Sequence, residues 1–496
     1  MQTETLDAAM AQTSPTRPTQ SAQPTLREFD ALPGPRGIPV LGNALQIEPS
    51  RFHQQLEAWC DEFGPLFKLQ IGKRKILVVG DHQRVALILR DRPDGFRRTA
   101  RFEAIWREMN LPTGVFGANG EPWLRQRRMV MAGFDPAHVK RYFPALQTVA
   151  QRLVGRWKAA ARANAAIELQ PDLMRYTVDT IAGLAFGAEV NTLESDGDVI
   201  QQHLDKIFPA LFKRILSPLP TWRYVPSAAN RALERSIVEV NLAVTGFVAQ
   251  ARERMQADPS LHENPRNLLE AMIAAADVPD SGIDDKQVAG NVLTMLLAGE
   301  DTTANSIAWM IHLLWRNPGA LARAASEVRW VVRDVNNPTF EEMAKLGYVE
   351  ACAHETMRLK PVAPILPLET LRETTIGDVR VPAGTIVISV MRRDSLSDSH
   401  LPRAAAFDPE RWLSAAADAS ATNGNSAKRV SMPFGAGPRI CPGRYLALLE
   451  MKMAMAVLLG NFDIENVTTP DGLEAREHLA FTMAPVGLRM KLKIRG

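Results

Sequence analysis

The hydrophobic and polar positions of the chain repeat mostly at the spacing of amphipathic helices. This spacing covers most of the roughly 300 residues that separate the early from the late strand candidates. Short runs of β-branched and aliphatic residues predict the strands, and a Gly-Lys-Arg triplet between the first two runs predicts a hairpin. We therefore expect a mainly α-helical protein with small β-sheets, in the α+β class. The predicted strands are residues 66–71, 75–79, 385–390 and 488–494.

Two segments differ in composition from this pattern. Residues 1–30 are polar, rich in Thr, Gln, Ser, Ala and Pro, and contain no apolar run that could serve as a signal or membrane anchor. We predict a disordered tail there, then a Pro-Gly hinge at residues 32–37 and a single domain over residues 31–496. Residues 414–431, rich in Ala, Ser and Asn, are predicted to form a surface loop.

The composition excludes several classes of protein. Of the 496 residues, 46% are hydrophobic and 23% are charged, which is typical of globular proteins rather than disordered or fibrous ones. The formal net charge of +3 is too small to favour nucleic acid as the main partner. The cysteines, Cys60, Cys352 and Cys441, are too widely spaced for a disulfide framework or a Cys-x-x-Cys zinc site. A reducing cytoplasm is the expected location.

Cys441 lies in a segment, residues 434–444, whose other residue types suit a thiolate that binds iron. Pro442 favours the first turn of a helix and residues 445–451 have helical spacing, so the sulfur is expected at a positive helix N-terminus, which favours thiolate over thiol. A lone cysteine is more often a buried, inert thiol. Here the glycines of the segment would let a flat ligand approach the backbone, and Arg439 offers a cation for an acidic substituent. Haem meets both requirements.

The segment matches the pattern Phe-x-x-Gly-x-Arg-x-Cys-x-Gly and therefore resembles the signature of the cytochrome P450 family, the haem-thiolate monooxygenases. Family-like segments follow in the expected order over nearly all of residues 33–493. The resemblance implies the cytochrome P450 fold, with haem b (iron protoporphyrin IX) between a helix that contains Ala298 and Thr303 and the loop that carries Cys441, the metal ligand. It also implies that the cofactor is bound by Phe434, Gly435, Arg439, Cys441 and Gly443 in this loop and by Ala298 in the helix.

The helical segment 291–303 is apolar at first and polar at its end, where two carboxylates and two hydroxyls follow Ala298 and a glycine. A Thr hydroxyl bonded back to a carbonyl can open a helix and admit water, and a neighbouring acid suits proton transfer through that water. The family resemblance assigns the catalytic acid and alcohol to Asp301 and Thr302, which deliver protons while dioxygen is activated. Glu300 projects in a different direction and is the less suitable acid. A solvated acidic turn or a helix cap is the non-catalytic alternative.

Two further sets of residues are suggested by helical spacing. Glu355 and Arg358 are adjacent on one helix face, which alone is typical of a solvated surface pair. The family resemblance adds Arg411, and the three together imply a buried ion network that stabilises the scaffold on the haem side. Trp123 and Arg127 lie one helical turn apart and resemble the Trp-x-x-x-Arg pair that holds a haem propionate. A basic surface stretch is the alternative interpretation of this second pair.

The chain departs from the family pattern at Glu369, where many relatives have a cation that helps to bind the second propionate. Arg372 could replace it by a local rearrangement, but the sequence does not establish this, and the cation is left unassigned. Other basic residues are candidates for a positive proximal face that binds an acidic redox protein: Arg125, Arg128, Lys428, Arg429 and Arg444.

The residues expected at the substrate are mainly apolar, which favours a hydrophobic or amphipathic small molecule. Ordinary core packing would explain any one of them equally well. They are Phe102, Trp106, Phe116, residues 208–219, Leu297, Ile365 and Phe481.

These observations predict a soluble, prokaryotic-style cytochrome P450 monooxygenase that inserts one atom of dioxygen into a lipophilic substrate. The chain ends soon after the Cys441 motif, so we expect a separate electron donor of the ferredoxin or flavodoxin type. A peroxide-driven peroxygenase is the alternative within this class, although such relatives tend to lose the Asp-Thr pair. A non-catalytic haem-binding sensor and a redox-active thiol protein are alternatives from other classes. Neither nucleic acid as a partner nor a membrane anchor is expected.

Overall fold

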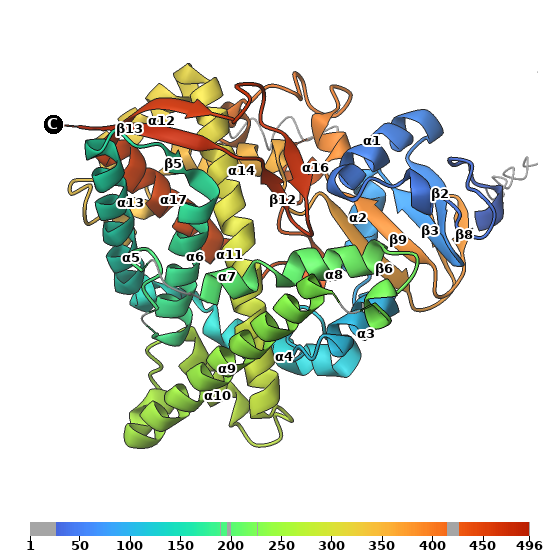
Figure 1. Ribbon diagram of the computed structural model, residues 1–496, viewed down its shortest axis with the longest axis horizontal. Coiled ribbons are helices and arrows are strands. Elements are labelled where there is room, and N and C mark those ends of the chain that lie inside the picture. Colours follow the sequence, from blue (N-terminus) through green and yellow to red (C-terminus); the bar gives the residue numbers. More distant parts are fainter. Residues whose placement is uncertain (1–25, 189, 196–199, 226, 414–425, 496) are drawn as a thin grey trace, which may run out of the picture.

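The computed structural model describes residues 26–188, 190–195, 200–225, 227–413 and 426–495. The fold is mainly helical, as predicted, and Figure 1 shows the long helices gathered in one part of the molecule, with β2, β3 and β9 at the opposite end. The helices are α1 (Phe52–Phe63), α2 (His82–Arg90), α3 (Ala100–Glu108), α4 (Gly120–Gly133), α5 (Pro136–Arg162), α6 (Leu169–Phe186), α7 (Ile200–Leu204), α8 (Ile207–Leu216), α9 (Ala228–Ala257), α10 (Leu268–Ala276), α11 (Asp285–Arg316), α12 (Pro318–Val331), α13 (Phe340–Met343), α14 (Gly347–Leu359), α16 (Ala427–Val430) and α17 (Arg444–Asn461).

The strands of the described residues form four small sheets that join distant parts of the chain. In the sheet β2-β3-β9-β6-β4, β2 and β3 form the predicted hairpin, and β3 pairs in parallel with β9, with Ile76 opposite Ile386. The other sheets are β1-β8-β7, β10-β13-β5 and β11-β12. The strands are β1 (Arg27–Glu28), β2 (Leu66–Ile71), β3 (Arg74–Val79), β4 (Phe96–Arg97), β5 (Ile167–Glu168), β6 (Ile365–Thr370), β7 (Thr374–Ile376), β8 (Val379–Val381), β9 (Ile386–Val390), β10 (Phe462–Thr468), β11 (Glu477–Leu479), β12 (Met483–Pro485) and β13 (Arg489–Ile494).

The boundary predicted for the disordered tail, residues 1–30, is too late in the sequence. Residues 1–25 lie outside the described residues, but Arg27 and Glu28 form β1, which pairs in parallel with β8. Phe29 follows in a 3₁₀ turn and is buried. Composition missed this contact because a two-residue strand is too short to produce a periodicity. Of the predicted loop at residues 414–431, residues 414–425 also lie outside the described residues, and α16 covers most of the remainder.

The long helix α11 lies at the centre of the helical part. Asp284 caps its N-terminus, because its carboxylate accepts a hydrogen bond from the Gln287 amide at 2.8 Å and its own amide donates to the Gln287 side chain at 3.0 Å. Most side chains between Val288 and Leu314 are buried, since α6, α14 and α17 pack against this helix. No helix of the described residues, α11 included, is long and apolar enough to span a membrane.

The ion network expected around Glu355 is present and buried. Arg358 donates to the Glu355 carboxylate from Nε at 2.8 Å and from Nη2 at 2.7 Å, and both side chains are inaccessible to solvent. Arg411 Nε and Trp412 Nε1 donate to the same carboxylate at 3.3 and 2.9 Å. The network therefore ties α14 to the 3₁₀ turn Pro409–Trp412.

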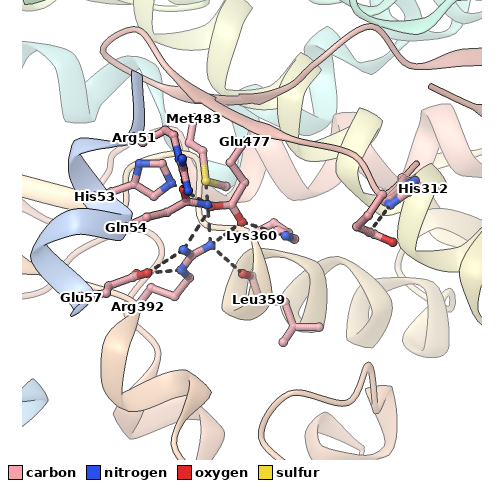
Figure 2. Close-up of polar contacts among 11 residues, drawn as sticks. Arg51, His53, Gln54, Glu57, His312, Leu359, Lys360, Arg392, Glu477 and Met483 are labelled. Carbon is pink, nitrogen blue, oxygen red and sulfur yellow. Dashed lines mark hydrogen bonds and ion pairs between the residues drawn. The ribbon is translucent and has the colours of Figure 1, made fainter. Parts of the chain in front are cut away.

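A second buried ion network joins the beginning of the chain to the β11–β12 hairpin, and Figure 2 shows its members. Arg392 donates to Glu57 of α1 at 2.8 Å and to Glu477 of β11 at 2.7 Å. His53 and Lys360 also contact the Glu477 carboxylate, at 2.8 and 2.7 Å. Burial alone would raise the pKa of Glu477, but the hydrogen bond with His53 and the charge of Arg392 hold it well below its usual range.

Candidate functional site

A cavity of about 440 Å³ lies between α11 and the loop that carries Cys441. Thr302 and Thr303 line it from α11, and most of its other lining residues are apolar. Of the two predicted catalytic residues, Thr302 lines this cavity and Asp301 does not. The residues predicted to bind the cofactor all line it: Trp123, Arg127, Ala298, Phe434, Gly435, Arg439, Cys441 and Gly443.

The loop before α17 is held in a fixed conformation by its backbone. The Cys441 amide donates to the Phe434 carbonyl at 3.0 Å, which closes the loop. Gly437 has a φ of +70°, and a Cβ atom there would lie 2.6 Å from the carbonyl oxygen of Leu89. Only glycine therefore allows this close approach to the end of α2.

The surroundings of the Cys441 sulfur favour the thiolate less than the sequence suggested. Burial raises the pKa of the thiol, whereas a hydrogen bond from the Gly443 amide and the charges of Arg127 and Arg444 lower it. The helix α17 begins at Arg444, so Pro442 precedes the helix instead of forming its first turn. The expected stabilisation of the thiolate by the helix N-terminus is thus corrected. A bound metal ion deprotonates its thiol ligand outright and would supply the remaining stabilisation of the thiolate.

Six arginines of the described residues line the cavity. None of the following four forms an ion pair with a carboxylate of these residues: Arg92, Arg98, Arg127 and Arg439. Desolvation lowers the pKa of Arg98 to about 10, and desolvation together with the charges of Arg98 and Arg127 lowers that of Arg439 to about 9. The Nε atoms of Arg92 and Arg439 are buried without a hydrogen-bond partner. Buried cations with free donors require anions, and the two propionates of a haem meet this requirement.

Trp123 and Arg127 lie at the cavity rather than on a basic surface stretch. Trp123 is buried, and the Arg439 guanidinium lies 4.4 Å from the centre of its ring. Arg439 Nη2 donates to the Ala118 carbonyl at 2.7 Å, and Arg127 Nη2 donates to the Ile440 carbonyl at 2.8 Å. These contacts fix the direction of both guanidinium groups.

Sequence reasoning missed Arg92 and Arg98. The position of Glu369 explains the departure from the family pattern, because its carboxylate pairs with Arg97 at 2.6 Å. Arg372 is exposed and pairs with Asp91 at 3.1 Å, so it does not supply the missing cation. The only local signal was a run of four arginines within residues 90–98, which does not reveal which of them face inward.

The acid and the alcohol of α11 face different spaces. The Thr302 hydroxyl donates to the Ala298 carbonyl at 2.6 Å, which is the back-bonding expected from the sequence. Asp301 instead accepts hydrogen bonds from Asn305 Nδ2 at 2.6 Å and from the Thr482 hydroxyl. Desolvation raises the pKa of Asp301, and these two hydrogen bonds oppose the rise.

A second cavity, of about 180 Å³, lies on the Asp301 side of α11. Asp205, Glu300 and Asp301 line it. Thr482, which sequence reasoning did not single out, borders both cavities, as does Phe208. The hydroxyl that bonds to Asp301 therefore lies at the partition between the two spaces.

Most of the predicted substrate residues line the main cavity. The ring of Phe481 stacks on that of Phe208, with 4.3 Å between the centres. Trp106 does not line this cavity but stacks on Phe102, at 5.5 Å, and Leu297 borders the second cavity instead. The predicted residues that do line the main cavity are Phe102, Phe116, Phe208, Phe212, Ile215, Leu216, Ile365 and Phe481.

Two arginines that sequence reasoning missed also line the main cavity. Arg101 Nε and Arg74 Nη1 donate to the Ile215 carbonyl at 2.7 and 3.2 Å, near the end of α8. Desolvation, with a contribution from the Arg101 charge, lowers the pKa of Arg74 to about 10. No carboxylate of the described residues pairs with either side chain, so this part of the cavity is positively charged.

The basic residues predicted to dock a redox protein do not all belong to one face. Arg444 Nη1 donates to the Cys441 carbonyl at 3.3 Å, which places this cation beside the cysteine loop. Arg125 packs against Gly282, in the segment before α11. The exposed members of the predicted set are Arg128, Lys428 and Arg429.

Together these features define a class of protein. A cysteine loop and a long helix, in which the Thr302 hydroxyl donates to the Ala298 carbonyl, enclose a mainly apolar cavity. Arginines that form no ion pair among the described residues line it. The crystal structure of the cytochrome P450DA heme domain has the same fold, with a TM-score of 0.80 at 23% sequence identity, over 95% of this chain and 99% of that one. The fold is that of a cytochrome P450 heme domain.

The family model for Cytochrome P450 matches residues 32–492, which is nearly the whole chain. The chain therefore belongs to the cytochrome P450 family, as the sequence resemblance predicted. The protein is accordingly an oxidoreductase of the P450 monooxygenase type that binds haem iron.

Curated relatives are distant and diverse. Cyclooctat-9-en-7-ol 5-monooxygenase of Streptomyces melanosporofaciens is 26% identical over 466 residues, which cover 92% of this chain and 95% of that protein. Protein LUTEIN DEFICIENT 5, chloroplastic, of Arabidopsis thaliana is 26% identical over 81% of this chain and 68% of its own length. The self-sufficient cytochrome P450 monooxygenase CYP505E5 of Aspergillus niger is 27% identical, and the match spans only 44% of its length.

Proposed function

We propose that the protein binds haem b, takes electrons from a separate ferredoxin- or flavodoxin-type donor, and inserts one atom of dioxygen into a hydrophobic or amphipathic small molecule. The observation that carries this proposal is the single apolar cavity that Cys441 borders from its loop and Thr302 borders from α11. When bound, the cofactor would supply dioxygen activation at an iron whose thiolate ligand donates electron density. The chain itself would bind the cofactor and the substrate, orient them and supply the protons.

The cofactor would be held by one ligand and a set of cations. Cys441 would ligate the iron, and Ala298 and Gly435 border the cavity where a flat ring would lie. Arg98 and Arg439 would bind the propionates, with Arg92, Arg127 and Trp123 completing the site. Phe434 and Gly443 belong to the same lining. The unpartnered Nε donors of Arg92 and Arg439 support an anionic ligand at this site.

Asp301 and Thr302 would deliver protons through water. The Thr302 hydroxyl faces the main cavity while it is bonded to the Ala298 carbonyl, so its oxygen can still accept a hydrogen bond. Asp301 lies behind it with a raised pKa, because desolvation disfavours its charge. A buried acid whose pKa is raised toward neutrality is suited to general acid catalysis.

The substrate would be largely apolar, and an acidic group at one end would suit the site. Phe102, Phe208 and Phe481 offer aromatic surface, whereas Arg74 and Arg101 offer the cations that an amphipathic molecule could meet. This combination supports the amphipathic alternative over a purely hydrocarbon substrate.

A separate acidic electron donor is supported by the charge near the cysteine loop. Arg444 lies beside Cys441, and Lys428 and Arg429 are exposed on α16. Positive surface charge accelerates association with a negatively charged protein. We propose a cytoplasmic location on the strength of Cys60 and Cys352, which are buried and free. Residues 31–496 would form one domain, because β3 and β9 belong to the same sheet.

A peroxide-driven reaction is the second candidate, and a substitution at Thr302 separates the two. We expect Thr302→Ala to keep its haem but to lower the product formed per electron by at least about ten-fold, since the hydroxyl that passes protons is lost. Peroxide release should rise correspondingly. The measurement compares NAD(P)H oxidation, peroxide and product with a panel of lipophilic compounds.

Thr245→Ala is the matched control for this substitution. The Thr245 hydroxyl makes the same bond to the carbonyl four residues earlier, at 2.8 Å, but lies exposed on α9. The amount of product that Thr245→Ala forms per electron should equal that of the wild type. If Thr302→Ala were equally well coupled, the monooxygenase relay would be ruled out, and product formation with peroxide alone would favour the peroxygenase.

A further inference from the structure

The second cavity contains an acidic cluster that the proposed function does not use. Asp205 lies in the turn between α7 and α8, and Glu300 and Asp301 are neighbours on α11. All three carboxyl groups line the same space of about 180 Å³. Figure 1 shows α7 and α8 beside the long helix α11. A space of this size, bordered by several polar side chains, is large enough to hold water.

Positive charge is nearly absent from this cluster. None of the three carboxyl groups forms an ion pair within the described part of the chain, and Lys206 is the only cation that acts on them, through Asp205. Their other partners are neutral: Gln201 donates to Asp205, and Asn305 and Thr482 donate to Asp301. Three adjacent carboxylates without counter-charge cannot all be ionised at low cost.

A structural role does not explain why the Glu300 side chain is buried in this cluster. Its side chain is only 2% exposed, it borders the cavity, and its Oε1 has no hydrogen-bond partner among the described residues. Its carboxyl group meets that of Asp205, which is exposed and so in reach of solvent. Desolvation, with the nearby charges of Asp205 and Asp301, raises the pKa of Glu300 well above its usual range. The pKa of Asp205 is raised to about 7 by desolvation and by the charge of Asp301.

We propose that Glu300 and Asp205 share a proton and form the solvent-side end of a relay that runs through Asp301 and the Thr482 hydroxyl into the main cavity. This inference rests on the proposed function, because it supplies protons to the reaction proposed there. It also gives Glu300, the less suitable acid for the main cavity, a role of its own: Glu300 borders the second cavity and not the main one.

Each step of the relay moves one proton and no electrons. In the structure the Thr482 hydroxyl donates to the Asp301 carboxylate. When Asp301 is protonated this hydrogen bond would reverse, so that Asp301 gives its proton to the Thr482 oxygen as the Thr482 hydroxyl passes its own proton into the main cavity. The Glu300–Asp205 pair then reprotonates Asp301 through water in the second cavity. Solvent restores the proton at Asp205, the exposed member. Thr482 is suited to this role because it borders both cavities.

The shared proton can be tested in the haem-loaded protein without measuring turnover. Because the pKa values of Glu300 and Asp205 are raised in the folded protein, they favour folding at low pH, and this contribution is lost as the pH rises from their ordinary values through the folded ones. We expect Asp205→Asn to flatten the fall in melting temperature between about pH 4 and 7, and Glu300→Gln to flatten the fall as the pH rises above the ordinary pKa of a Glu side chain. Infrared spectra should also lose one protonated-carboxyl band that shifts in D₂O.

The relay itself is tested by proton-dependent kinetics. We expect the double variant Asp205→Asn, Glu300→Gln to lower coupled product formation by about ten-fold and to increase the solvent isotope effect, because a slower proton supply becomes rate-limiting. Thr482→Val should have the same effect, whereas Thr482→Ser, which keeps the hydroxyl, should restore the wild-type values. Glu253→Gln is the matched control and should resemble the wild type, because this carboxyl on α9 is exposed and forms no ion pair with another described residue.

The outcomes distinguish this inference from the proposed function. If no variant binds haem or forms product, and neither does the wild type, the proposed function fails, whereas the infrared band and the pH profile still report on the shared proton. If the wild type is a coupled monooxygenase and the double variant matches it in isotope effect and pH profile, the relay is overturned. A protonated pair with unchanged kinetics would overturn it as well. Loss of the band together with a raised isotope effect supports it.

Discussion

Arg92, Arg98 and Arg439 bring guanidinium groups to one cavity without carboxylates to balance them. Desolvation and mutual repulsion make such an arrangement unfavourable in a protein that binds no anion. At the scale of single residues, these cations therefore indicate that the cavity suits an anionic ligand. The exposed Arg372, paired with Asp91, has no such role.

The arginines that line the main cavity lead to a prediction for how tightly the protein retains haem. We expect Arg98→Leu to weaken haem binding by about ten-fold or more, because a charge-assisted hydrogen bond to a propionate contributes about 1.5–3 kcal/mol. Transfer of haem to an excess of apomyoglobin, followed by absorbance, measures the effect. Arg372→Leu serves as the control and should release haem at the wild-type rate. Equal rates for both variants would contradict the assignment of Arg98.

At the scale of elements, α14 is attached to the 3₁₀ turn Pro409–Trp412 by one carboxylate. Glu355 accepts from Arg358, Arg411 and Trp412 and is completely buried. Removing one partner of a buried ion pair leaves uncompensated charge, which costs more than the loss of a surface pair. The network thus determines how the turn that leads toward the cysteine loop is placed.

We expect Glu355→Gln to lower the free energy of unfolding by about 3–5 kcal/mol, because the buried Arg358 loses its counter-charge. Chemical denaturation of the haem-loaded protein measures the change. Glu410→Gln is the control from the same turn: its ion pair with Arg323 is about half exposed, so the loss should be about 0–1 kcal/mol. Similar losses of unfolding free energy for the two variants would show that the buried network stabilises the protein no more than an exposed ion pair does.

The elements also show what could be predicted from sequence. The hairpin β2–β3 and the helix α11 followed from periodicity, because each has a long, regular pattern of apolar residues. The contact of β1 with β8 and the inward direction of Arg98 did not, because each depends on pairing between segments far apart in the chain. Thr482 was missed for the same reason: a threonine after Phe481 has no local signal, and only the fold places it against Asp301.

At the scale of the whole molecule, the buried network in Figure 2 connects α1, α14 and the β11–β12 hairpin. Arg392 is 4% exposed and contacts both Glu57 and Glu477. The same hairpin continues into Phe481 and Thr482, which border the main cavity. Stability of the whole protein and placement of the cavity wall are therefore linked through Glu477.

The network predicts how stability depends on pH. The pKa of Glu477 is held below its ordinary value of 4.5, so its contribution is fully present above pH 4.5 and is lost as the pH falls below this value. We expect Glu477→Gln to be destabilised by about 3–5 kcal/mol at pH 7 and to approach the wild type in acid. Denaturation curves measured across this range test the expectation, with the exposed Glu465→Gln as control. A difference that is independent of pH would contradict it.

Ligation of haem iron by the sulfur of Cys441 is the claim on which the proposed chemistry depends. The most direct test is the absorbance spectrum of the reduced protein under carbon monoxide, for the wild type and for Cys441→Ala. We predict the red-shifted band of a thiolate-ligated haem in the wild type and its absence in the variant. The same band in Cys441→Ala, or a wild type that takes up haem without ever showing the band, would contradict the account.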